Sequence, residues 1–97
     1  MNREEQDKLN QEVRRSDKAK QILDNPIFKE SIEELKKLYT TSLFNTGVKE
    51  QDAREKLWMA YQVVGKVEQH IQEILDTGKL ASKQLEDFRK EIKPERF

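Results

Sequence analysis

The 97-residue sequence predicts an all-α protein, on three observations. Apolar residues recur at alternating steps of four and three between positions 53 and 74, the a/d spacing that places side chains on one side of a helix. No proline interrupts this stretch, and Gly65 weakens it by roughly 1 kcal/mol relative to alanine. Charged residues make up 39% of the chain, 19 of each sign, as expected for long helices with solvated faces. The seam comprises Ala53, Leu57, Ala60, Val64, Val67, Ile71 and Ile74.

The composition limits the classes of protein that fit. The chain has no cysteine, which excludes disulfides, a thiolate nucleophile and zinc–thiolate sites. The net charge of zero gives no general attraction to nucleic acid or to an anionic membrane. The N-terminal residues contain no apolar signal segment, and no apolar run approaches the roughly 18 residues that span a bilayer. We expect one domain with a thin core, soluble and intracellular.

The N-terminal quarter is predicted to form little stable structure by itself. Residues 1–15 are polar apart from Leu9 and Val13, so a helix there should be frayed or depend on a partner. Ser16 or Asp17 can cap a short helix that follows. Asn25 before Pro26 then marks a boundary, because proline disfavours helical geometry in the residue before it and suits the first position of a helix.

Two longer helices are predicted to follow. The first runs from Pro26 to Phe44 and ends at residues 45–47, where Gly47 can adopt the left-handed conformation. The second covers residues 52–77, with Gly78 just beyond its end. The short connection between them predicts antiparallel neighbours. The apolar stripe of the first helix comprises Phe28, Ile32, Leu35 and Tyr39, widened by Leu38 and Leu43.

A last helix over residues 82–92 is predicted to end before Pro94. The expected fold is therefore an all-α central antiparallel helical hairpin of residues 26–77, with shorter N- and C-terminal helices, in a single domain of residues 1–97.

The sequence carries no recognisable catalytic or metal-binding pattern. His70 is the only histidine, and with Glu73 three residues later it gives two ligands, too few for a metal site. Nucleophilic catalysis by serine or threonine needs a positioned base and an acid that orients it. We expect His70 on a partly exposed helix surface, no cofactor, no metal and no enzymatic activity.

Trp58, Tyr61 and Leu75 form a second apolar strip beside the seam. Either the terminal helices cover this strip, or it is a subunit interface, where aromatic residues are enriched. The sequence predicts a homo-oligomer joined along the long helix, with Trp58 at or near the contact. A local basic run is either a nucleic-acid contact or solvated surface; it comprises Arg14, Arg15, Lys18 and Lys20. The tail adds basic residues that include Lys93 and Arg96.

Three stretches together resemble short, charged helical proteins of tailed bacteriophages, from the head and packaging gene region. They are residues 25–30 at the start of the hairpin, residues 52–58 at the start of the long helix and residues 76–80 at its end. The likeness covers residues 17–81 and rests on helix boundaries. It implies a phage setting, in which a self-associating hairpin looks like the oligomerisation core of small terminase subunits. The chain lacks their helix-turn-helix domain, which places DNA recognition in doubt.

The sequence-based hypothesis is thus a non-enzymatic phage assembly or DNA-packaging factor that acts as a homo-oligomer. Its partners would be phage packaging or head proteins, with DNA binding left open, in the cytoplasm of the infected host cell or in the virion. The alternative is a small adaptor or inhibitor that binds a host protein through an exposed helix face.

Overall fold

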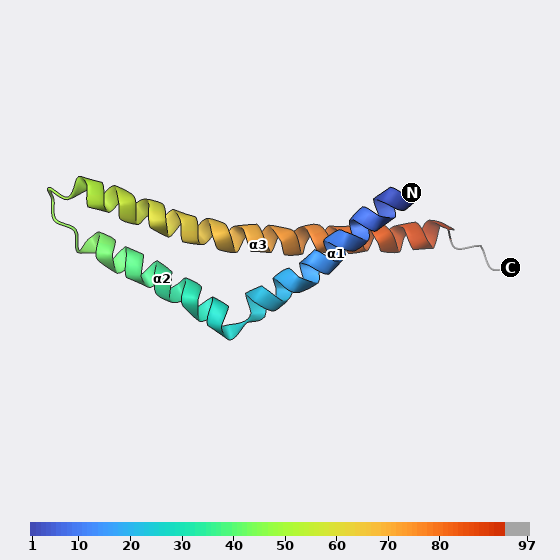
Figure 1. The fold of residues 1–97 in the computed structure, drawn as a ribbon, viewed down its shortest axis with the longest axis horizontal. Coiled ribbons are helices and arrows are strands. Elements are labelled where there is room, and N and C mark those ends of the chain that lie inside the picture. Colours follow the sequence, from blue (N-terminus) through green and yellow to red (C-terminus); the bar gives the residue numbers. More distant parts are fainter. Residues whose placement is uncertain (93–97) are drawn as a thin grey trace. The chain divides into compact units, whose positions relative to one another are not determined.

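The computed structural model describes residues 1–92 and contains three helices: α1 (Arg3–Asp24), α2 (Pro26–Phe44) and α3 (Gln51–Ile92) (Figure 1). The described residues include no strand, so the predicted all-α class is confirmed. The predictions for Lys93, Pro94 and Arg96 lie outside the described residues.

The chain divides into two compact units, each treated by itself below. The middle unit comprises residues 22–71, and the terminal unit comprises residues 1–21 with the chain from Gln72 onward. Helix α3 contributes its first half to the middle unit and its second half to the terminal unit.

The start of α2 matches the sequence prediction to the residue. Asn25 has an extended backbone, and its side-chain oxygen accepts hydrogen bonds from the amides of Ile27 (2.8 Å) and Phe28 (3.1 Å). Pro26 occupies the first helical position, where no amide hydrogen is needed. The helix ends at Phe44, as predicted. No glycine has a positive φ, so Gly47 does not adopt the left-handed conformation that the sequence allows. Asn45 closes the helix in right-handed geometry instead, at φ −89°.

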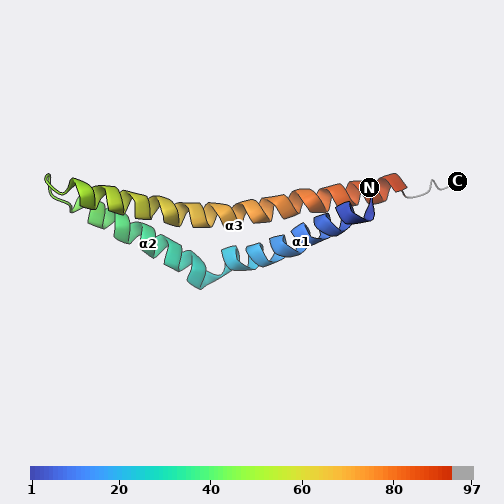
Figure 2. The same cartoon turned by 45° about the horizontal axis from the view of Figure 1, so that its top comes forward.

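Within the middle unit, α2 runs beside the first half of α3 and in the opposite direction (Figures 1 and 2). Ile32 is the one large apolar side chain of this unit that is buried, at 7% exposure. The seam residues Leu57 and Val64 are half-buried, but Val67 is 47% exposed, so its predicted place in the core is wrong. The apolar stripe predicted for α2 is wider than the surface that α3 covers, as the 56% exposure of Leu38 shows.

In the terminal unit, α3 continues through Gly78 without a break. The predicted helix end at Thr77 and the separate shorter C-terminal helix are therefore wrong. The heptad steps of the seam run on from Ile74 through residues 78, 81, 85 and 88, which keeps the same side of α3 apolar or small. A helical glycine costs about 1 kcal/mol, whereas burial of Leu85 (7% exposed) contributes about 1.5–3 kcal/mol. The free energy gained by burial therefore exceeds the cost of the glycine, and the helix continues.

Helix α1 lies against the second half of α3 and runs in the opposite direction (Figure 1). It is one helix of 22 residues, longer than the 19 residues of α2, so the predicted shorter N-terminal helix is wrong. Ser16 is buried in the helix interior and is not an N-cap. The contact is made by small side chains: Ser16 and Ala19 on α1, Gly78 and Ala81 on α3.

Candidate interaction surfaces

One side of the middle unit carries five exposed apolar side chains. On α2, Leu35 and Leu38 lie three residues apart and are exposed. On α3, Met59, Val63 and Val67 follow one another at steps of four residues and are also exposed. Steps of three and four place side chains on one face of a helix. We call these five residues the aliphatic face.

An ion pair at the opposite edge shows that both helices present this face to the same side. Lys36 Nζ lies 2.9 Å from Glu68 Oε1, which joins α2 to α3. Leu35 and Val67 each precede one member of this pair by one residue. One residue rotates a helix position by about 100°, so both apolar side chains lie at the other edge of the helix contact. The hydrogen bond to the Glu68 carboxylate raises the pKa of Lys36.

The edge with the ion pair also carries two of the three predicted interface residues. The Trp58 and Tyr61 rings stack, with centroids 5.8 Å apart and 16° between their planes. Trp58 is 51% exposed and borders a shallow groove of about 380 Å³ that Leu43 and Arg54 also line. The guanidinium of Arg54 donates to the main-chain carbonyls of Gly47 and Val48, which fixes the connection beside this groove.

The third predicted interface residue, Leu75, belongs to the terminal unit. It is half-buried, and its carbonyl accepts a hydrogen bond from the Ser16 hydroxyl. The structure thus brings Trp58 and Tyr61 together in one cluster, while Leu75 takes part in the contact between α1 and α3.

The four predicted nucleic-acid contacts are exposed on α1 but do not share one face. Arg14 and Lys18 are one turn apart, and Arg15 lies beside them. Lys20 is two residues beyond Lys18, which turns it about 160° away from that side chain. Three of the four cations can therefore contact one phosphate backbone together.

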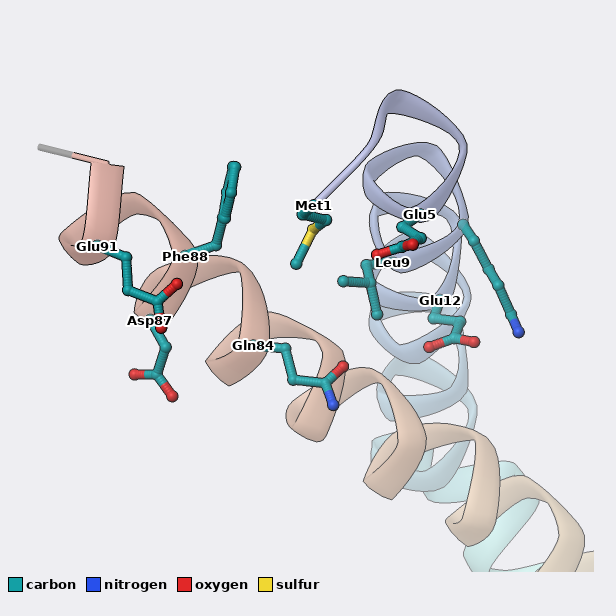
Figure 3. Close-up of a pocket in the computed structure, with 9 residues that line it drawn as sticks. Met1, Glu5, Leu9, Glu12, Gln84, Asp87, Phe88 and Glu91 are labelled. Atoms are coloured by element: carbon teal, nitrogen blue, oxygen red, sulfur yellow. The ribbon is translucent and has the colours of Figure 1, made fainter.

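A groove in the terminal unit was not predicted from the sequence. It lies between the start of α1 and the end of α3, with a volume of about 640 Å³ (Figure 3). Met1 and Leu9 point toward the space between the helices, and Phe88 lines the groove on the α3 side. The remaining lining residues are mostly acidic: Glu5, Glu12, Asp87 and Glu91, with Lys8 and Gln84. The sequence signal for this groove was the presence of Leu9 on α1 and of Phe88 on the continued seam of α3. It could be used only if α3 was predicted to continue beyond Gly78.

Among the described residues, no group of three or more His, Cys, Asp or Glu side chains could hold a metal ion. His70 lies exposed on α3. In the same part of the chain, no helix is both long and apolar enough to cross a membrane. No protein-family model, curated protein or solved structure gives a significant match to this sequence.

Proposed function

We propose that this chain is a non-catalytic helical module that works by self-association. The observation that carries the proposal is that the middle unit exposes more large apolar side chains than it buries. Ile32 is its one buried large apolar side chain, whereas both α2 and α3 expose apolar side chains to solvent. Scattered exposed apolar residues are ordinary, but a group of them on one face marks an interaction site.

Two properties of the chain favour a second copy as the partner. Domains of this size often complete their cores by oligomerising. The formal net charge is zero, so copies do not repel one another at long range.

The biological setting of the proposal comes from the sequence resemblance alone. Under that resemblance, the module is a phage assembly or DNA-packaging factor, with phage head or packaging proteins as its partners. DNA contact would involve Arg14, Arg15 and Lys18, which lie on one side of α1.

The test is the molar mass of the chain in solution, by light scattering and sedimentation equilibrium across the micromolar range. We expect a homo-oligomer that forms without DNA. A stable monomer throughout this range contradicts the proposal. A parallel titration with labelled duplex DNA tests the packaging role; binding lost in the R14E/R15E/K18E variant but kept in wild type supports it.

A second candidate function is an adaptor that binds another protein through an exposed helix surface. The acidic groove of the terminal unit favours it, because a basic segment with one apolar side chain matches four carboxylates around Leu9 and Phe88. A monomer that binds a basic amphipathic peptide, and loses this binding in the F88E variant, would favour the adaptor over the self-associating module.

A further inference from the structure

We propose that the aliphatic face is where a second copy binds, with α2 of each copy lying on α3 of its partner. The inference rests on the proposed self-association and goes beyond it by assigning the contact, the two-fold arrangement and a pair of charges that selects it. Leu35 and Leu38 of one copy would then meet Val63 and Val67 of the other.

The aliphatic face is better suited to this contact than the Trp58 edge. Trp58 already stacks on Tyr61 of its own chain, and charged or amide side chains surround it: Gln51, Arg54 and Glu55. The aliphatic face draws apolar residues from two helices, and Val63 is 58% exposed. A broad apolar surface with charges at its margin is the usual anatomy of a protein interface.

The charges at the margins of this face are self-complementary. Glu34 lies four residues before Leu38, on the outer margin of α2, and Lys66 lies three residues after Val63, on the outer margin of α3. Both side chains are exposed. Glu34 is on one helix and Lys66 on the other, so a contact that pairs α2 with α3 of the partner brings these two opposite charges together.

The register of the two helices places Glu34 and Lys66 about 6 Å apart along the helix axis, which is about one turn. Lys36 and Glu68 meet across the helix contact, so residues 34–38 of α2 lie near the level of residues 66–70 of α3. A two-fold axis parallel to the helices keeps each residue at its level and exchanges α2 with α3 of the partner. Glu34 of one copy then lies near Lys66 of the other, twice in each dimer.

The other two-fold arrangement of the same face is disfavoured. An axis perpendicular to the helices, in the plane of the contact, lays α2 on α2 and α3 on α3 of the partner. Glutamates then gather on the α2 side and lysines on the α3 side, which places like charges together.

Charge reversal distinguishes these arrangements. We measure the dimer dissociation constants of wild type, E34K, K66E and the double variant by sedimentation equilibrium at low salt. Each single reversal replaces attraction by repulsion at both ends of the dimer, and we expect it to weaken dimerisation roughly tenfold. The double variant restores opposite charges and should recover most of the loss. A mixture of the two single variants should form a heterodimer with near wild-type affinity, since both of its charge pairs are then complementary.

A matched pair of substitutions tests the face itself. We expect V63E and L38E to give monomers that keep their helical circular dichroism, whereas W58E, on the opposite edge of the same unit, still dimerises. If W58E dissociates the dimer and both V63E and L38E leave it intact, the assignment of the contact to the aliphatic face is wrong, but the proposed self-association is not contradicted. If the single charge reversals leave the dissociation constant unchanged, the pairing of α2 with α3 is wrong. A monomeric wild type overturns the proposed function itself.

Discussion

The hydroxyl of Ser16 donates a hydrogen bond of 3.0 Å to the main-chain carbonyl of Leu75, three residues before Gly78. At Gly78 the helices approach so closely that a Cβ atom would lie 1.9 Å from the Ser16 Cβ and 2.7 Å from the main-chain oxygen of Glu12. This contact between small residues holds α1 on α3 in the terminal unit. It combines close backbone approach and one partly buried hydrogen bond with the burial of Leu85 elsewhere in the same unit.

Gly78→Ala should destabilise the terminal unit, because the main-chain oxygen of Glu12 cannot move aside as a flexible side chain would. Overpacking of this kind costs about 1–3 kcal/mol. Gly65→Ala is the matched control in the same helix, since apart from the backbone of its own helix and its chain neighbours no atom lies within 4 Å of its added Cβ. That substitution should stabilise by about 0.5–1 kcal/mol through helix propensity. Chemical denaturation followed by circular dichroism measures both changes; equal effects of the two substitutions would contradict the close approach at Gly78.

The Lys36–Glu68 ion pair should contribute little to stability, although it joins two helices. Its side chains are 34% and 43% exposed, so solvent screens the attraction. A double-mutant cycle with K36M and E68Q should give a coupling energy of about 0.2–1 kcal/mol, falling as salt is added. A coupling several times larger would mean that the pair is buried in solution, as it would be inside an oligomer.

The contribution of Lys36 should also depend on pH in a defined direction. Its pKa is raised above the ordinary value of 10.5, chiefly by the hydrogen bond to Glu68. A raised pKa means that this stabilisation is complete below the unfolded-state pKa and is lost as the pH rises through the folded-state value. The difference in melting temperature between wild type and K36M should therefore be constant from neutral to mildly alkaline pH and shrink above pH 10.5. A difference that grows in this alkaline range would show the opposite linkage.

Local signals in the sequence predicted the bounds of α2 correctly, but the signals near Gly78 predicted a helix end that does not exist. Asn25 and Pro26 fix the start of α2 through contacts within four residues, which a sequence displays directly. Asp76, Thr77 and Gly78 look like a helix end, yet the seam keeps its steps of four and three beyond them. The deciding contribution comes from α1, which lies far away in sequence and meets α3 through Ser16 and Ala19, and the polar Ser16 is a residue that hydropathy does not mark as core.

The candidate surfaces were only partly visible in the sequence for a similar reason. Trp58 and Tyr61 attract attention because they are aromatic, and they do lie together. Met59, Val63 and Val67 form an equally regular row at steps of four, but Val67 is itself a seam residue and the other two each lie beside one, so the sequence accounts for all three as core. Their exposure depends on the angle at which α2 packs, which a single sequence does not reveal.

The placement of α1 also has a consequence for the order of synthesis. The Ser16–Leu75 bond joins residues 59 positions apart, whereas Lys36 and Glu68 are 32 apart. A ribosome makes α1 before the α3 residues that pack on it. The middle unit can fold once residue 71 has emerged, but α1 has no α3 partner until the residues beyond Gln72 have also been made. Closure of the terminal unit therefore follows synthesis of every residue of the middle unit.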